Sequence, residues 1–290
     1  MLANEPWPAL EGLHVGLDEL GYQEGKDFHI EYRFAEGATE RFAGLAAELV
    51  SLPVDVIVAW GTPAALAARK ATSSIPIVMS AGDDPVGAGL ISSLARPGGN
   101  VTGLSSQPAG GEEKRLVLLK ELRPSLSRVA VLSNPTNPYS IIAVEHARRG
   151  AAALGLSLDV VEVSAVSELD AAFRTMREKS ADAALVIADP FLAHERALVA
   201  KLLVEHQLPS ISAYHECAVA GGLMAYMTSY YDIFRREAIF IDKIFEGAKP
   251  GDLPIEQPTK FELVINLKTA KALGLEVPPS LLVHANRLIE

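Results

Sequence analysis

Short apolar segments that end in glycine or polar loops alternate with helical patterns along this chain. Val54–Trp60 is one such segment, Gly61 follows it, and a helical pattern begins at Thr62-Pro63, where a proline in the first turn costs little. Strands with few polar residues are typical of parallel sheets that helices cover on both faces. The alternation therefore predicts an α/β fold.

The same alternation restarts in the second half of the chain. In the first half we expect helices at residues 8–21, 39–51 and 62–72 and strands at 28–34, 54–60, 75–80 and 101–105. In the second half we expect helices at 111–122, 139–154, 167–178 and 190–206 and strands at 128–133, 156–163, 183–188 and 209–213. A strand at 223–228, a helix at 229–246, a strand at 261–267, a helix at 268–273 and a turn at Pro278-Pro279 follow. Gly155 is the expected end of the helix before it.

These elements group into two similar Rossmann-like lobes with parallel sheets, joined by a three-stranded hinge. We expect an N-terminal lobe of residues 1–104 plus 226–256 and a C-terminal lobe of residues 105–225 plus 257–290. Three thin connections suit a closure of the lobes around a ligand. The chain starts on a helical pattern, although such a lobe normally starts on a strand. We therefore expect the first strand and its loop to be missing or replaced by other residues.

Composition excludes several classes of function. The formal net charge of −10 argues against nucleic acid as a partner, because a phosphate backbone needs a basic face. The single cysteine, Cys217, allows no intrachain disulfide and is expected to pack as a small hydrophobe. No apolar run reaches membrane-spanning length, and residues 1–8 lack the basic start and apolar core of a signal peptide.

Catalytic and cofactor motifs are scarce. The chain has no Gly-x-Ser-x-Gly elbow and no phosphate loop that ends in Gly-Lys-Ser/Thr. Gly87-Ala-Gly-Leu90 resembles the start of a dinucleotide fingerprint but lacks its third glycine. The seven histidines never fall at a metal-ligand spacing. We therefore expect no catalytic residue, no cofactor and no metal.

Binding chemistry gathers instead in the loops that follow the predicted strands. A strand that opens into a helix presents free backbone amides and a positive dipole end, which suit a carboxylate or phosphate. A carboxylate in such a loop can hold an ammonium group, and asparagine amides can donate and accept at once. The candidate ligand-binding residues are Trp60, Gly61, Thr62, Pro63, Ser80, Gly82, Asp84, Asn134, Asn137, Asp189, Tyr214 and Glu216.

Plain structural roles compete with binding at several of these positions. Thr62, Asn137 and Asp189 also suit helix N-caps. Asp83-Asp84-Pro85 also suits an ordinary turn, with Asp84 the better ligand candidate. Trp60 and Tyr214 suit a flat apolar wall of a pocket, but Trp60 fits a core position equally well.

Several segments in combination resemble one family. They are Gly16-Leu-Asp-Glu-Leu-Gly-Tyr-Gln-Glu-Gly25, Gly61-Thr-Pro-Ala-Ala65, Asp84-Pro-Val-Gly87, Leu94-Ala-Arg-Pro-Gly-Gly-Asn-Val-Thr-Gly103, Asn134-Pro-Thr-Asn-Pro138 and Pro258-Thr-Lys-Phe-Glu-Leu-Val-Ile-Asn-Leu-Lys-Thr-Ala270. Together they cover nearly the whole chain. The chain thus resembles the ABC-transporter substrate-binding proteins of a family once of unknown function, which includes tryptophan-binding lipoproteins.

The resemblance implies a type I periplasmic-binding fold and a solute receptor of an ABC importer. Such a receptor captures a small polar ligand, here an amino acid of aromatic or branched type, in the cleft between its lobes and delivers it to a membrane permease. It implies a periplasmic or extracytoplasmic location and a monomer without catalytic activity. It also implies that Thr62 and nearby amides seat the ligand carboxylate, with Asp84 near the ammonium end.

Two other classes of function stay open at this level. A ligand-sensing regulatory domain shares the fold, but the basic helix-turn-helix that such repressors carry at the N-terminus is absent from this sequence. An enzyme with its site between the lobes would need an acid and a base, for which Asp84 and Asp189 are the available pair.

Overall fold

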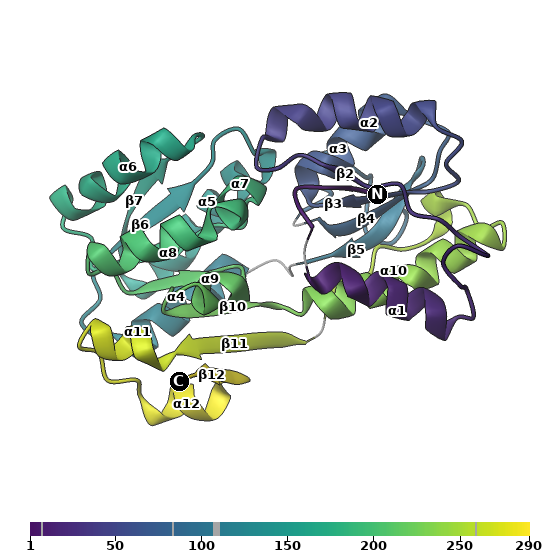
Figure 1. Cartoon of the computed structure of the whole chain (residues 1–290). Coiled ribbons are helices and arrows are strands. Elements are labelled where there is room, and N and C mark those ends of the chain that lie inside the picture. The colour runs from purple at the N-terminus through teal and green to yellow at the C-terminus, as the bar shows by residue number, and fades with distance from the viewer. Residues whose placement is uncertain (7, 83, 107–110, 259) are drawn as a thin grey trace. The chain divides into compact units, whose positions relative to one another are not determined.

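The computed structural model describes residues 1–6, 8–82, 84–106, 111–258 and 260–290, and the chain divides into two compact units. Unit 1 consists of Met1–Pro108 and Thr228–Lys260, and unit 2 consists of Ala109–Met227 and Phe261–Glu290. The chain therefore passes between the units three times. Figure 1 traces this path by colour.

Unit 1 is built on a sheet with the strand order β2-β1-β3-β4-β5, in which every neighbouring pair is parallel. Its strands are β1 (Leu2–Ala3), β2 (Arg33–Phe34), β3 (Ile57–Trp60), β4 (Ile77–Gly82) and β5 (Val101–Ser105). Its helices are α1 (Glu11–Glu19), α2 (Phe42–Ser51), α3 (Thr62–Ala71) and α10 (Tyr230–Phe245), with 3₁₀ turns η1 (Pro8–Leu10), η2 (Thr39–Arg41) and η3 (Pro250–Asp252).

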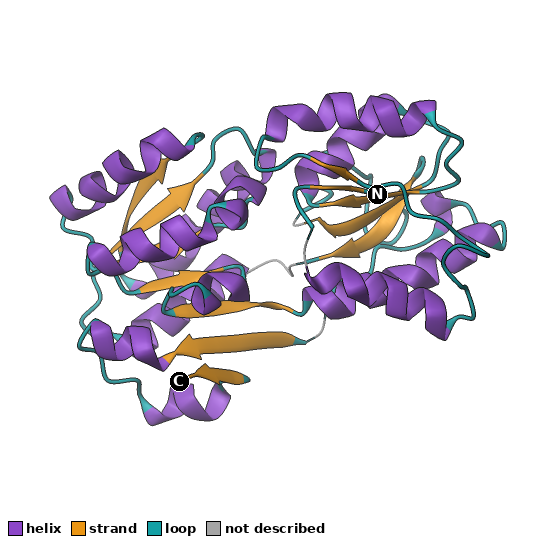
Figure 2. Cartoon of the chain, viewed as in Figure 1, coloured by secondary structure: helices purple, strands orange, loops and turns teal. Residues whose placement is uncertain are grey.

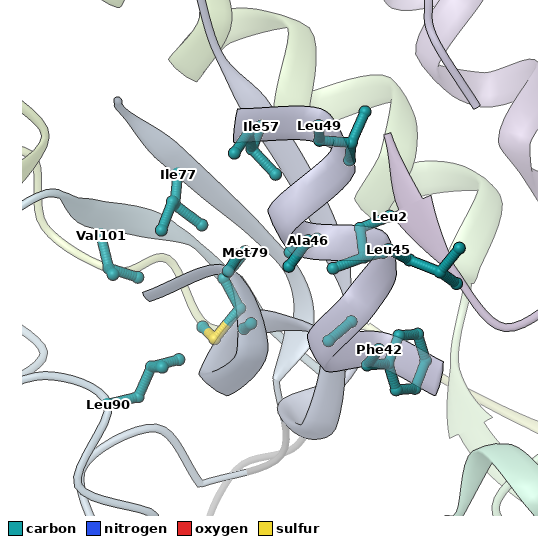
Figure 3. Close-up of a cluster of buried hydrophobic side chains, with 14 of the residues drawn as sticks. Leu2, Phe42, Leu45, Ala46, Leu49, Ile57, Ile77, Met79, Leu90 and Val101 are labelled. Atoms are coloured by element: carbon teal, nitrogen blue, oxygen red, sulfur yellow. The ribbon is translucent and has the colours of Figure 1, made fainter. Parts of the chain in front are cut away.

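Helices cover both faces of this sheet, with α2 and α3 on one face and α1 and α10 on the other (Figure 1). The face under α2 holds a hydrophobic core of unit 1, which Figure 3 shows in close-up. Phe42, Leu45 and Leu49 recur at helical spacing on α2, and Ile77 and Met79 alternate on β4 toward them. Such two-sided cover explains why β3 and β4 are apolar along their length.

The opposite face depends on a close approach between α1 and α10. A Cβ atom at Gly12 would meet the backbone oxygen of Tyr231, and one at Gly16 would meet that of Arg235. These two glycines therefore let the helix backbones pack directly against each other. Segments more than 200 residues apart in the sequence thus form one layer of unit 1.

Unit 2 is built on a larger sheet with the strand order β12-β11-β10-β9-β8-β6-β7. Its strands are β6 (Arg128–Ser133), β7 (Ser157–Glu162), β8 (Ala183–Val186), β9 (Ser210–Ser212), β10 (Met224–Thr228), β11 (Phe261–Asn266) and β12 (Arg287–Ile289). Its helices are α4 (Gly111–Leu122), α5 (Pro138–Leu154), α6 (Val166–Glu178), α7 (Pro190–His194), α8 (Arg196–Glu205), α9 (His215–Val219), α11 (Leu267–Ala272) and α12 (Pro279–His284). Figure 2 shows strands in orange and helices in purple.

A core beneath α6 and α8 supports the first strands of unit 2. Phe173 and Met176 of α6 and Leu203 of α8 are buried against Leu132 and Val186 of the sheet. The pairings β6–β7, β6–β8, β8–β9 and β9–β10 are all parallel. The carboxyl ends of these strands therefore lie along one edge of the sheet.

The expected α/β architecture with two parallel sheets is confirmed, and several local expectations are wrong. The first strand of unit 1 is present as Leu2–Ala3 and lies in the middle of the sheet, between β2 and β3. The expected strand at 28–34 is reduced to Arg33–Phe34. The expected helix at 190–206 is two helices that meet at Glu195, and the chain beyond the Pro278-Pro279 turn forms α12 and β12.

Candidate ligand-binding site

The two sheets share one arrangement that locates a binding site in α/β proteins. In unit 1 the first strand, β1, lies between β2 and β3, and in unit 2 β6 lies between β7 and β8. The connections that follow the two adjacent strands, β1 and β3 in unit 1 and β6 and β8 in unit 2, run toward opposite edges of the sheet. Such a place is a topological switch point, and α/β proteins generally bind their ligands at the carboxyl ends of the two strands there. The candidate loops are therefore those at Asn4 and Gly61 in unit 1 and at Asn134 and Asp189 in unit 2.

Three of the candidate residues meet in unit 2. Asn134 follows β6, and its Nδ2 lies 3.3 and 3.2 Å from the two carboxylate oxygens of Asp189. Asn137 donates from its Nδ2 to Asp189 Oδ2 at 3.1 Å. All three side chains are at most 1% exposed. The fold thus brings together residues that are more than 50 positions apart in sequence.

Each of these three residues also shapes its own loop. Asp189 is the N-cap of α7 and accepts from the Leu192 amide at 3.0 Å. Asn137 is the N-cap of α5 and accepts from the Tyr139 amide at 3.1 Å. Asn134 Oδ1 accepts from the Thr136 amide at 3.0 Å. The cluster therefore holds the β6 and β8 loops in one geometry.

The Asp189 carboxyl is deeply buried, and that burial is the main influence on its charge. Loss of water raises the pKa of Asp189 above the ordinary value for aspartate. Hydrogen bonds from Leu192, Asn137 and Asn134 act in the opposite direction and offset part of that rise. The Asp189 carboxyl is therefore a buried acceptor of hydrogen bonds from the surrounding loops, and it is not exposed to solvent.

In unit 1 the candidates divide between the core and the start of α3. Trp60 is 8% exposed and packs edge-on against Tyr230 and Phe234, with ring centroids 6.1 and 5.7 Å apart. Gly61 is the N-cap of α3 with a φ of 82°, in the region that favours glycine. Thr62 and Pro63 form the buried first turn of that helix.

The end of β4 carries three further candidates. Ser80 is fully buried on the strand and pairs in register with Trp60. Gly82 is the last residue of β4. Asp84 accepts from the Gly87 amide at 2.8 Å and so closes the turn that follows. Asp83, next to it in the sequence, lies outside the described residues.

The last two candidates flank the start of α9 in unit 2. Tyr214 is the N-cap residue of α9 and is 6% exposed. Glu216 Oε1 lies 3.1 Å from Nε2 of His215. Burial raises the pKa of the neighbouring Cys217 thiol to about 12, so this cysteine is an inert packing residue.

Sequence reasoning missed two buried polar residues of unit 1. Asn4 is the first residue after β1, is 4% exposed, and accepts from the Gly37 amide at 2.8 Å. Glu237 lies on α10 and is fully buried. The missed signals are the spacing Asn4-x-x-x-Pro8, which matches Asn134-x-x-x-Pro138, and the position of Glu237 on the apolar face of α10.

The described residues form neither a metal site nor a membrane-spanning helix. Among them, no group of three or more histidine, cysteine, aspartate or glutamate side chains is arranged to hold a metal ion. None of the described helices combines the length and the apolar character that a membrane crossing requires.

Solved structures show the class of fold to which this arrangement belongs. The crystal structure of a conserved domain protein from Vibrio cholerae is 30% identical and matches with a TM-score of 0.93 over 99% of this chain and 97% of that chain. A domain from Streptococcus pneumonia, solved in complex with L-Trp, is 29% identical and also matches with a TM-score of 0.93, over 99% and 98% of the two chains. The fold is that of a type I periplasmic binding protein.

Sequence comparison narrows the class to a family. Residues 7–289 match the family described as ABC transporter substrate binding protein, and the chain belongs to this family. A tyrosine-binding protein from Clostridioides difficile is 31% identical over 274 residues, which are 92% of this chain and 77% of that protein. The family resemblance inferred from the sequence motifs is confirmed.

Proposed function

We propose that this protein is the solute receptor of an ABC importer and that its ligand is a free aromatic amino acid. Family membership and the relatives named for tyrosine and solved with L-Trp support this proposal. The structural observation that carries it is the matching arrangement of strands β2-β1-β3 and β7-β6-β8, with a buried asparagine directly after the central strand in each unit.

The chemistry of these loops suits a zwitterion. Side-chain amides can donate to a carboxylate and accept from an ammonium group. The first turn of α3 adds backbone amides and a positive dipole end in unit 1. Asp84 and Glu216 are the candidate carboxylates for the ammonium end. We propose that Thr62 seats the ligand carboxylate.

The receptor works by a shift in population. A ligand that takes contacts from loops of both units stabilises the arrangement in which both sets of loops reach it. A permease that recognises this arrangement receives the ligand, and ATP hydrolysis elsewhere drives its transport. We place the protein outside the cytoplasm, as the family implies, and we assign it no catalytic step.

Isothermal titration calorimetry tests the ligand class directly. We expect saturable one-to-one binding of L-tyrosine or L-tryptophan to the full chain, with a smaller radius of gyration in X-ray scattering when ligand is present. D-Tryptophan and L-alanine serve as matched negative ligands. Absence of heat with both aromatic amino acids would show that the proposed ligand class is wrong.

A turnover assay separates this receptor from an enzyme. Ligand recovered after a long incubation with stoichiometric protein should have an unchanged mass. A changed mass would instead favour the reading in which Asp84 and Asp189 act as acid and base.

A further inference from the structure

Unit 2 contains a cavity apart from the cluster of Asn134, Asn137 and Asp189. It has a volume of about 430 Å³ and lies between α5 and the strands β6 and β7. A cavity of this size suits a small molecule. Strand β6 lies between β7 and β8, so this cavity is on the β7 side of β6, whereas the cluster joins the loops of β6 and β8. The two places are therefore distinct.

The fold leaves one polar atom in this cavity unsatisfied. Ser140 lines the cavity and is 1% exposed, and its Oγ has no hydrogen-bond partner among the described residues. Buried polar groups are usually paired, because an unpaired one loses its bonds to water without replacement. Ser140 does not cap α5 either, since that role belongs to Asn137. A ligand in the cavity would supply the partner that the chain does not.

Two further oxygen groups line the same cavity from the sheet. Ser133 of β6 and Glu162 of β7 are paired in register, so their side chains lie on the same face of the sheet, about 4.8 Å apart. Ser133 is buried, whereas Glu162 is exposed at the rim. Carboxylates and serine hydroxyls both accept hydrogen bonds. Together with Ser140 the cavity thus offers three acceptor groups, which equals the number of N–H donors on a primary ammonium group.

The charges of the lining favour a cation. Arg148 Nε lies 3.4 Å from Glu145 Oε1, so these two charges largely offset each other. Glu162 forms no ion pair with any described residue, so the lining keeps one net negative charge. The described residues hold no group of side chains arranged for a metal ion, so the matching cation is an organic one.

The start of α5 does not make the cavity an anion site. A helix N-terminus attracts anions mainly through backbone amides that have no partner. Here the Tyr139 amide donates to Asn137 Oδ1 at 3.1 Å, and the Ser140 amide donates to the Asn137 carbonyl at 2.9 Å. Both donors are therefore occupied, and the acceptor side chains decide which charge the cavity takes.

Apolar side chains complete the cavity, with Ile141 and Val144 from α5 and Val160 from β7. We therefore infer that this cavity is a second binding site, and that it takes a small primary amine. The ammonium group donates to the Glu162 carboxylate and to the two serine hydroxyls, and the alkyl chain lies against the apolar side chains. The inference goes beyond the proposed function and does not depend on it.

A titration with n-butylamine at pH 7, where the amine is protonated, tests the inference on the full chain. We expect saturable shifts of the Ser140 and Glu162 amide signals in two-dimensional NMR, with a Kd of about 1 mM for so small a ligand. Butyltrimethylammonium keeps the charge and the chain but has no N–H donor, and n-butanol has no charge. Both should bind at least about tenfold more weakly.

Two variants examine the acceptors. Ser140→Ala should weaken butylamine by about tenfold without lowering the urea concentration at which the chain unfolds, because the lost hydroxyl is buried without a partner. Glu162→Gln removes the net charge and should weaken butylamine by about tenfold as well. Glu178→Gln makes the same change at the exposed end of α6, away from the cavity lining, and should leave the affinity unaltered.

Each contrary outcome overturns the inference. Butylamine without saturable shifts, equal binding of butyltrimethylammonium, or unaltered affinity in both Ser140→Ala and Glu162→Gln would each do so. Saturating L-tyrosine or L-tryptophan should leave the Kd of butylamine unchanged, and competition would mean that no separate amine site exists. Failure of both aromatic amino acids to bind would overturn the proposed function, and the amine titration would still decide the inference.

Discussion

A buried carboxyl in unit 1 leads to a quantitative prediction about stability and pH. Glu237 lies on α10, is fully buried, and neither of its carboxyl oxygens has a hydrogen-bond partner among the described residues. Burial raises the pKa of Glu237 well above the ordinary value of 4.5. The nearby Ser80 hydroxyl opposes that rise, but it makes no hydrogen bond of normal geometry with either oxygen.

The direction of the effect follows from proton linkage. In the unfolded chain Glu237 loses its proton near pH 4.5, whereas in the folded chain it keeps the proton to a higher pH. The folded state then binds one more proton, so the contribution of Glu237 to the free energy of unfolding is largest below pH 4.5 and falls as pH rises toward the folded pKa. The slope is about 1.4 kcal/mol per pH unit. This slope applies only over the pH range in which the folded group keeps its proton and the unfolded group has lost it.

The substitution Glu237→Gln removes this titration at nearly constant volume. We expect the stability of the variant relative to wild type to rise as the pH increases above about 4.5, by at most about 1.4 kcal/mol per pH unit. Urea unfolding at pH 5, 6 and 7 measures the difference, with fluorescence of Trp60 as the probe because its indole packs against Phe234, one turn from Glu237. Glu246→Gln, at the exposed end of the same helix, is the control. Parallel pH curves for wild type and Glu237→Gln would refute the reasoning.

Two further predictions concern packing. Gly16→Ala should destabilise unit 1 by about 1–3 kcal/mol, because the new Cβ would press on the backbone oxygen of Arg235. Gly44→Ala in α2 is the control. Its new Cβ meets no neighbouring atom, so the substitution should stabilise unit 1 by about 0.5–1 kcal/mol. Urea unfolding of both variants checks the sign, and equal effects would contradict the packing of α1 on α10. Arg115→Met should cost about 3–5 kcal/mol in the same assay, because it leaves the Glu112 charge buried without its ion-pair partner. A cost below about 1 kcal/mol would show that the Tyr139 hydroxyl, which donates to Glu112 Oε1 at 3.1 Å, is a sufficient partner for the buried carboxyl.

The sequence predicts the regular elements well where apolar periodicity is long enough to read. The strand at Val101–Ser105 has the predicted bounds, and Gly155, with a φ of 66°, ends α5 as expected. The two-residue strand Leu2–Ala3 has no periodicity of its own. Its place in the sheet depends on pairing with Arg33–Phe34 and with β3, which are 30 and more residues away.

In the candidate site, too, some features follow from local sequence and others depend on contacts between residues that are distant in the sequence. Loops after strands follow from the pattern, and so do the caps at Asn137 and Asp189. The hydrogen bonds that join Asn134 to Asp189 depend on β6 and β8 lying side by side, which local sequence does not encode. Glu237 looks like a solvated helix residue by type, and only the packing of α10 against β4 makes it a buried acid.

The pairing of α1 with α10 sets the order in which the molecule can be completed during synthesis. α1 (Glu11–Glu19) precedes unit 2 in the sequence, but the helix that covers it begins at Tyr230, after the whole contiguous stretch Ala109–Met227 of unit 2. One side of the first sheet therefore lacks one of its two covering helices while the stretch Ala109–Met227 is translated. A nascent chain at that stage exposes apolar surface, which makes it a natural client for chaperones.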